Sequence, residues 1–505
     1  MDITATKRRA MASTAGPGDG LAAGTLLVMG AEALAFPAGL VVTILLTRHL
    51  GPQQYGTLAL ALTAIAWLEW TVVSLFSRAA YKLVAEADDW RPAAEAVVRT
   101  FLLASLAAAV VVFALAGVAG RVFGAPDLTL LLRILAVEIP IFVAAQAYRS
   151  VLVGRGLHGS RAAVAALRWT VRAVLVAGGV LAGVPMSVIV MLIVAATAVE
   201  LWIARRLALV GRGSDEAGGR TSSEHLTMRR LLSYAAPLAV SAICLRLFER
   251  LDIFALRLLG GTMESVAAYG VAQNLALMPG LFGGAFVPAL IAGLSSRLAG
   301  GDADSARQLG GQALRAAFLF LPLVLIAAGA APALIDLLFG PSWAAAAPLF
   351  AVLVAGAAGT LVMGLCGGML IAAGRFRWTI ALAAPLLLIA LAGHLLVVPR
   401  AGAIGAAAVT SGTALLGAAA SCAAVWRLLA HPVPLASLGR ALVFGGAAGW
   451  AARSLPAMGM ALPFVLVLLI GAVAIALWLT GEVRPEERVR ARLWAQSLSF
   501  GKSRE

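Results

Sequence analysis

The sequence predicts an all-α membrane protein whose chain crosses the bilayer about fourteen times. Of its 505 residues, 61% are hydrophobic and only 12% are charged, and the mean hydropathy is +0.95. Such a chain has too few polar side chains to cover a soluble globule. Its apolar residues also gather into runs of about 20, the length that a helix needs to cross the hydrocarbon core. These two observations together indicate a polytopic helical fold.

Fourteen apolar runs reach this length, and polar breaks separate them. The runs fall near residues 21–47, 57–77, 97–119, 128–152, 163–182, 186–204, 231–259, 266–294, 313–334, 344–371, 376–398, 403–425, 437–455 and 458–479. The basic stretch before the first run is rich in Gly, Ser and Thr and has no cleavage pattern, so residues 1–20 are predicted to be a disordered cytoplasmic tail.

The lysines and arginines are distributed very unevenly between alternate loops. With a cytoplasmic N-terminus, the inside segments contain 29 of the 39 Lys and Arg residues, the outside segments contain five, and five lie within the runs. Cytoplasmic loops carry this excess in membrane proteins. The pattern therefore predicts that both termini are cytoplasmic. It also accounts for the net charge of +15 without nucleic acid as a partner.

The two halves of the chain resemble each other at three landmarks that each follow a predicted helix. RHLG ending at Gly51 recurs as RLLG ending at Gly260, VFGAP around Gly124 recurs as LFGPS around Gly340, and LVGR ending at Arg155 recurs as AAGR ending at Arg375. Three matches in register favour a six-helix repeat. Because six is even, both copies enter the membrane in the same direction, which makes two parallel lobes.

The predicted organisation follows from this repeat and from the polar breaks. After the tail come an N-lobe over residues 21–204, a cytoplasmic linker over 205–230, a C-lobe over 231–426, two additional helices within 437–479, and a cytoplasmic tail over 480–505. The linker is the longest polar break and contains Gly, Ser and six Arg residues, as a flexible connection between two halves would.

Several stretches resemble a known family in their order along the chain. TRHLGPQQYGTLALA (47–61) is similar to the turn after the first helix of the polysaccharide transporters, which belong to the multidrug/oligosaccharidyl-lipid/polysaccharide (MOP) flippase superfamily. The run from ERLDIFALRLLGG to GGDADSARQL (249–309) resembles the second half of that family, and LFGPSWAAAAPLF, LIAAGRFRW and GAIGAAAVTSG follow in family order. The resemblance covers roughly residues 25–480.

This resemblance implies a flippase that moves polyprenyl-diphosphate-linked oligosaccharide from the inner to the outer leaflet by alternating access. It implies a multi-pass, monomeric protein of the bacterial cytoplasmic membrane, with membrane lipids and a coupling proton or sodium ion as further partners. The chain departs from the twelve-helix O-antigen flippases by its two extra helices. A lipid II flippase, which also has fourteen helices, and a drug/cation antiporter of the same superfamily remain open alternatives.

Arginines inside the predicted spans are the candidate substrate ligands, since guanidinium stays charged in a low dielectric and offers paired donors to phosphate. Arg246 and Arg250 share one helical stripe with Arg257, and Glu249 and Asp252 flank it. Arg246 and Arg250 could bind a diphosphate or could be paired internally with these acids. Arg257 has the weaker case, because it could simply lie at the membrane interface.

Arg168 and Arg172 form a second pair on one face of the run 163–182, in the cytoplasmic leaflet. A substrate arriving from the inner leaflet would meet them first. Arg168 could instead extend its charge to the membrane surface, whereas Arg172 lies a turn deeper and does so less readily.

Three buried acids are candidates for ion coupling: Glu32, Glu69 and Glu138. A desolvated carboxylate can exchange a proton near neutral pH. Glu32 is the first choice because it lies deepest, while Glu138 could equally neutralise an arginine of the first lobe.

The sequence predicts neither a catalytic site nor a metal or cofactor site. Cys244, Cys366 and Cys422 lie in apolar runs without CxxC spacing or histidine partners. Outward loops reach only about ten residues and contain no acidic clusters of the kind that a membrane glycosyltransferase would need. We therefore expect a transporter and not an enzyme.

Overall fold

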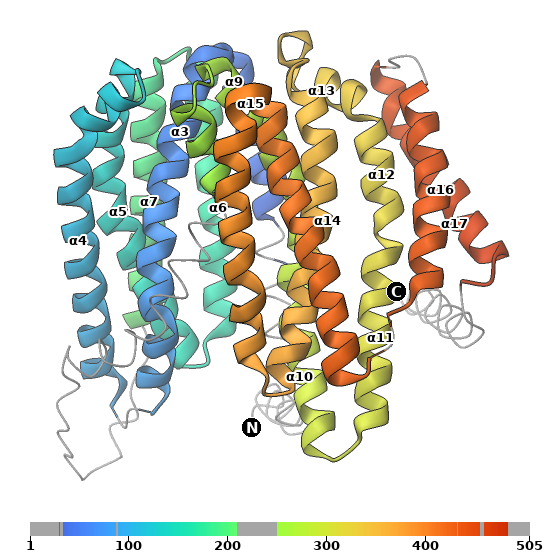
Figure 1. The fold of residues 1–505 in the computed structure, drawn as a ribbon. Helices are drawn as coiled ribbons and strands as arrows, with labels where there is room; N and C mark the ends of the chain where they lie inside the picture. The colour runs from blue at the N-terminus through green and yellow to red at the C-terminus, as the bar shows by residue number, and fades with distance from the viewer. Residues whose placement is uncertain are drawn as a thin grey trace, which may run out of the picture. The chain divides into compact units, whose positions relative to one another are not determined.

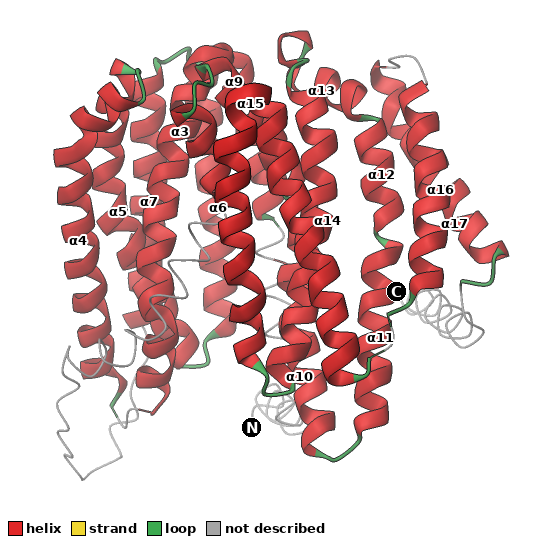
Figure 2. Cartoon of the chain, in the orientation of Figure 1, coloured by secondary structure: helices red, strands yellow, loops and turns green. Residues whose placement is uncertain are grey.

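The structure is a computed structural model that describes residues 30, 34–86, 89–209, 250–431, 433–454 and 459–482. Within these ranges the chain is almost entirely helical and contains no strand (Figures 1 and 2). The all-α prediction is confirmed. The two tails beyond these ranges, most of the linker, Glu32 and Arg246 lie outside the described residues.

All fourteen predicted spans coincide with helix wherever they are described. Nine helical stretches of the described chain are long and apolar enough to cross a membrane. Two of them, α3 (Ala35–Glu86) and α15 (Phe376–Leu429), each contain two predicted spans, which meet at a kink at Gly51 and at Gly402. Both glycines have positive φ, the backbone conformation that glycine adopts without strain.

The helices group into two compact units. The first contains residues up to Asn274 together with Ala390–Ala406 of α15, and the second contains the rest. The domain boundaries and the parallel arrangement of lobes remain predictions. In the first unit α3 is followed by α4 (Trp90–Val122), α5 (Pro126–Gly154), α6 (His158–Leu181), α7 (Met186–Leu209), a helical stretch over 250–258, and α9 (Met263–Ala276), which ends just beyond the unit.

Helix α5 is the centre of the first unit and packs against α3, α4, α6 and α7. Most of its residues are buried, including Glu138, Gln146 and Arg149, whereas Leu130 and Val137 are exposed. Helix α4, by contrast, exposes large apolar side chains such as Leu103, Val110 and Phe113. In a membrane protein such a face is suited to contact lipid. The buried polar groups of α5 face protein, and Glu138 and Arg149 form part of the site described below.

Loops that the topology places on one side of the membrane meet in the first unit. Nε2 of His49 lies 3.0 Å from the carbonyl oxygen of Val184. The Arg257 guanidinium donates to the carbonyl oxygens of Phe123 and Gly261. These loops are all predicted to lie outside, so their contacts agree with the alternation of the spans.

Loops predicted to be cytoplasmic meet in the same unit as well. Arg155 donates from Nη1 to the carbonyl oxygen of Ala208 at 2.6 Å. Its guanidinium also lies 3.9 Å from the centroid of the Trp90 ring. The Arg155 contacts thus join three segments that the positive-inside pattern assigns to one side.

The second unit contains α10 (Met278–Ala299), α11 (Ala303–Leu319), α12 (Leu321–Gly329), α13 (Ala331–Phe339), the 3₁₀ turn η1 (Pro341–Trp343), α14 (Ala346–Ala372), the two ends of α15, α16 (Leu435–Ser454), the 3₁₀ turn η2 (Gly459–Ala461) and α17 (Leu462–Leu479). Helix α14 is its most buried element and packs against α10, α11, α12 and α13. Helices α11 and α12 meet at Phe320, just before Pro322. Together they form one stretch, Ala303–Gly329, that is long and apolar enough to cross a membrane.

The additional helices α16 and α17 are joined to this unit by close backbone contact. A Cβ on Gly449 of α16 would lie 2.5 Å from the carbonyl oxygen of Leu325 in α12, and a Cβ on Gly329 would lie still closer to the Gly449 carbonyl. Small residues allow membrane helices to approach in this way.

A buried ion-pair cluster forms a second connection to the additional helices. Glu482, directly after α17, is 3% exposed and accepts hydrogen bonds from Arg315 of α11 at 2.7 Å and from Ser437 and Arg440 of α16. Burial alone would raise the pKa of Glu482, but these donors and the charge of Arg315 lower it to about 2. The carboxylate is therefore ionised at neutral pH and links three helices.

The described turns add a fourth landmark to the internal repeat. Gly51 and Gly260, Gly124 and Gly340, Gly156 and Gly374, and Gly183 and Gly402 all have positive φ, and all follow or separate helices. The third pair lies two residues beyond the LVGR glycine, because Gly154 is the last helical residue of α5 and Gly156 is the positive-φ glycine that follows it. The fourth pair lies between the last two helices of each predicted repeat, so the turn geometry supports the repeat.

Candidate functional site: a buried charge cluster in the first unit

Six charged side chains from four helices of the first unit approach one another within the membrane-spanning segments. They are Glu69 of α3, Glu138 and Arg149 of α5, Arg168 and Arg172 of α6, and Glu200 of α7. All six lie within segments that are long and apolar enough to span a membrane. Charges are costly at such depth, and the ones that persist are normally paired or functional.

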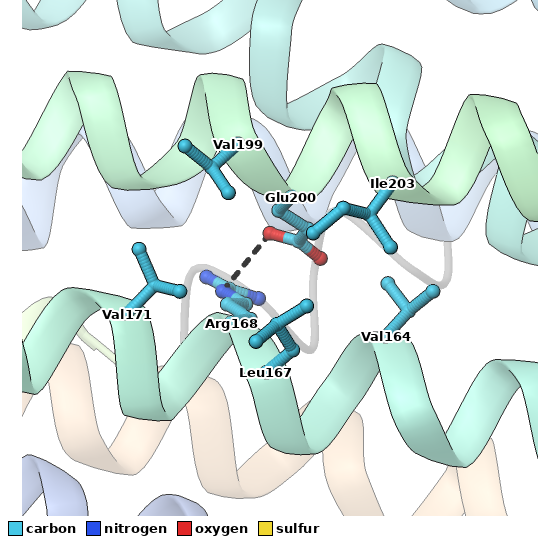
Figure 3. Close-up of a pocket in the computed structure, with 7 residues that line it drawn as sticks. All are labelled: Val164, Leu167, Arg168, Val171, Val199, Glu200 and Ile203. Carbon is cyan, nitrogen blue, oxygen red and sulfur yellow. Dashed lines mark ion pairs between the residues drawn. The ribbon is translucent and has the colours of Figure 1, made fainter.

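Glu200 is the centre of the ion pairs in this cluster (Figure 3). It is 2% exposed, and its Oε2 lies 3.2 Å from Nε of Arg168. Its Oε1 lies 3.6 Å from Nη1 of Arg149 and accepts a long hydrogen bond from Gln146. Two arginines therefore share one carboxylate.

Arg168 is held by more than this ion pair. Its guanidinium lies 4.7 Å from the Phe142 ring centroid and 5.2 Å from that of Trp169, both within range of a cation–π interaction. Arg168 and Glu200 form the polar part of a small pocket between α6 and α7, whose other lining residues are Val164, Leu167, Val171, Val199 and Ile203 (Figure 3). In this conformation Arg168 thus has a structural role as well.

Arg172, one turn further along α6, makes no hydrogen bond or ion pair with the described residues. The charges of Glu69, Glu138 and Glu200 nevertheless act on it. Of the two arginines that the sequence predicts on this face, Arg172 is therefore the one that could turn towards an incoming anion without breaking an ion pair seen here.

The carboxylates of Glu138 and Glu69 differ in how well they are satisfied. Glu138 is 4% exposed and accepts a hydrogen bond from Thr197 at 2.8 Å. Glu69 is 5% exposed, and its Oε1 is buried without a hydrogen-bond partner among the described residues. An unsatisfied carboxylate oxygen in a dry site is costly unless a proton or a cation joins it.

The second predicted site is only partly described. Arg250 does not contact Asp252 directly: its Nη1 donates to Oε1 of Gln273 at 2.9 Å, and Nε2 of Gln273 donates to Asp252 at 2.9 Å. Asp252 also accepts a hydrogen bond from Tyr269 at 2.7 Å. The acid that was expected to flank Arg250 is thus connected to it through a glutamine. Arg257 is bonded to loop carbonyls, which agrees with its weaker case as a ligand.

Glu200, at the centre of the cluster, was not among the residues predicted from the sequence. Glu200 is the single acid of the run 186–204, and an intramembrane acid in the same predicted lobe as Arg168 was a sufficient signal to include it. Gln273 could not have been found in this way, because amides are common and its role depends on which neighbours α9 meets.

Comparison with known proteins agrees with this architecture. The profile of the polysaccharide biosynthesis protein family matches residues 21–291, which is more than half of the chain. No curated protein matches.

Three solved structures illustrate the shared fold. The chain is similar to the lipid II flippase MurJ in an inward closed conformation, with a TM-score of 0.73 and 13% identity over 91% of this chain and 100% of that one. An inward-facing MATE family multidrug resistance transporter of the MOP superfamily has a TM-score of 0.66 and 13% identity over 80% and 98%. A MOP superfamily transporter from Pyrococcus furiosus has a TM-score of 0.56 and 15% identity over 82% and 96%.

At these identities the solved structures establish the fold alone. The family profile, by contrast, matches the amino-acid sequence over more than half of the chain and therefore establishes the family. The chain therefore belongs to the polysaccharide biosynthesis protein family, and it has the fold of the MurJ and MATE structures.

Proposed function

We propose that this protein moves a polyprenyl-diphosphate-linked oligosaccharide from the inner to the outer leaflet of the bacterial cytoplasmic membrane. It does so as a monomer, by alternating access coupled to an ion gradient, with both termini in the cytoplasm. The observation that carries the proposal is Arg172, a cation within a membrane-spanning helix that makes no hydrogen bond or ion pair with the described residues.

A diphosphate suits this position for electrostatic and geometric reasons. Guanidinium keeps its charge when it is desolvated and presents several donors in a plane, so it matches the oxygens of a phosphate group. At about 1.5 Å per residue, Arg168 lies roughly 15 Å and Arg172 roughly 21 Å from the start of α6. The predicted topology places that start at the cytoplasmic surface. A headgroup moving inwards from the inner leaflet would therefore reach Arg168 first and Arg172 next.

Arg250 supports a later position along the same route. It is predicted to lie in the outer half of the membrane, and its hydrogen bond to Gln273 leaves other guanidinium donors for a ligand. Arg246, its predicted companion, lies outside the described residues. The four arginines Arg168, Arg172, Arg246 and Arg250 are thus the proposed substrate ligands.

Glu69 is the strongest described candidate for the coupling ion. Its Oε1 is buried without a hydrogen-bond partner among the described residues, whereas Glu138 is satisfied by Thr197. A proton on Glu69 would remove a buried charge that the cluster satisfies only in part. Glu32, the first choice from the sequence, remains a prediction because it lies outside the described residues.

Two related functions compete with this one. A lipid II flippase would bind a lipid that carries the same diphosphate group. The MurJ structure also covers 91% of this chain, whereas the MATE structure covers 80%. A drug/cation antiporter is disfavoured because an available arginine repels a cationic substrate. The lipid-linked glycan that accumulates in a deletion strain of the native host would distinguish the oligosaccharide from lipid II.

The ligand role of Arg172 is tested by an in-cell flipping assay on Arg172→Gln. Loss of one charge-assisted contact, about 1.5–3 kcal/mol, should slow flipping roughly ten- to a hundredfold at wild-type expression. Arg133→Gln is the matched control, because Arg133 is an exposed arginine in the membrane-spanning α5 that packs over Phe113. Normal flipping by Arg172→Gln would contradict the proposal.

A further inference from the structure

The charges of the buried cluster balance one another. Glu200 of α7 pairs with Arg149 of α5 and Arg168 of α6. Its charge and that of Glu138 of α5 both act on Arg172 of α6 and on Glu69 of α3. With every group ionised, the three arginines match the three glutamates. By formal charge alone, the fully ionised cluster therefore has no net charge.

A diphosphate entering this cluster would upset that balance. The headgroup brings about two negative charges into a site where electrostatic energies are several times larger than in water. It must also compete with Glu200 for Arg168, whose Nε is already 3.2 Å from Oε2 of that carboxylate. An anion beside a carboxylate favours the protonated form of that carboxylate.

We propose that Glu200 is a displaceable counter-ion, and that a diphosphate binds at Arg168 and Arg172 together with proton uptake by Glu200 and its neighbouring carboxyls. The proposal rests on the proposed function, since it takes the diphosphate-linked lipid as ligand. Beyond that function, Glu200 links binding of the substrate to uptake of a proton.

The contacts of Glu200 indicate why it is the group to be displaced. Arg149 lies 3.6 Å from its other oxygen, and Gln146 donates to that oxygen, so a protonated Glu200 keeps two polar neighbours after Arg168 has turned to the phosphate. Glu138, by contrast, receives a hydrogen bond from Thr197 and makes no ion pair within the described part of the chain. Glu69 Oε1 has no hydrogen-bond partner among the residues that the structure describes, so Glu69 is a second acceptor for a proton.

Calorimetry on the full chain in nanodiscs tests this linkage. The probe is farnesyl diphosphate, farnesol is the uncharged control, and inorganic diphosphate shows whether the lipid is needed. Titrations in two buffers with different ionisation enthalpies give the number of protons taken up, after correction for the titration of the probe itself. We expect net uptake, and an affinity that falls about tenfold per pH unit for each linked proton as the pH rises from about 7 to about 8.5.

Glu200→Gln should remove the competitor and one proton acceptor together. At about pH 8 it should bind farnesyl diphosphate at least tenfold more tightly than the wild type, and its pH slope should be smaller by about one proton. The matched control is Glu264→Gln, because Glu264 is an exposed acid of α9 in the same unit. This control should leave both quantities unchanged.

The outcomes separate this proposal from the proposed function. Binding of farnesyl diphosphate without proton uptake, or with a dependence on sodium in place of pH, would overturn the linkage but leave diphosphate recognition intact. No binding at any pH would overturn recognition itself. Uptake by the wild type decides whether binding is linked to protons, and the slope of Glu200→Gln decides whether Glu200 is an acceptor. Inorganic diphosphate that binds with the same uptake supports the linkage and identifies the free headgroup as sufficient.

Discussion

Substitution of Glu482 by Gln should weaken the attachment of α16 and α17 to the second unit. The pKa of Glu482 is lowered from 4.5 to about 2 by its donors. A difference of about 2.5 pKa units corresponds to roughly 3 kcal/mol. The Arg440 side chain is 38% exposed, so solvent screens its share, and we expect a loss of about 2 kcal/mol at neutral pH.

The pH dependence has a definite sign. Because the pKa is lowered on folding, the ionised carboxylate stabilises the folded state fully above about pH 4.5, and this stability is lost as the pH falls towards about 2. The unfolding free energies of wild type and Glu482→Gln should therefore differ at neutral pH and converge in acid.

Detergent-solubilised protein unfolded with SDS and followed by tryptophan fluorescence provides the assay. The control is Asp304→Asn, since the Asp304 carboxylate also pairs with an arginine, Arg307 at 3.1 Å, but is 88% exposed. An exposed pair contributes at most about 1 kcal/mol. Equal losses for the two variants, or a gap for Glu482→Gln that persists to about pH 2, would refute the reasoning.

Two further predictions concern contacts between helices. Gly449→Ala should lower the unfolding free energy by about 1–3 kcal/mol because its Cβ would lie 2.5 Å from a carbonyl oxygen of α12, whereas Gly446→Ala, with nothing within 4 Å, should not. Equal unfolding curves for the two variants would contradict the close approach. Gln273→Leu should cost about 1–3 kcal/mol and slow flipping, because Arg250 and the buried carboxylate of Asp252 both lose a hydrogen bond to Gln273. Wild-type stability of Gln273→Leu would show that this connection is not needed.

Different parts of the architecture were predictable to different degrees. Span positions follow from local hydropathy, because a membrane helix satisfies its own backbone and needs about 20 apolar residues whatever its neighbours are. Helix ends were less accurate: α7 continues to Leu209, five residues beyond the predicted end of its run, and α5 continues to Gly154, two residues beyond the predicted end of its run. Those details depend on capping contacts and not on hydropathy.

The arginine pair of α6 shows where sequence reasoning stops. Arg168 and Arg172 share a face by helical periodicity alone. That Arg168 is paired with Glu200 while Arg172 has no such partner among the described residues depends on how α6 and α7 are rotated about their axes. A one-dimensional pattern contains no information on that rotation.

The sequence by itself determined the all-α membrane fold, the positions of the spans and the presence of charged residues inside them, because burial in lipid imposes these features on each segment separately. Only the tertiary structure decided which charges meet. It placed three arginines with three glutamates, made Glu200 the shared counter-ion, and connected Arg250 to Asp252 through Gln273. The physical reason is that a buried charge is stabilised by its nearest partners, and those partners come from helices that are far apart along the chain.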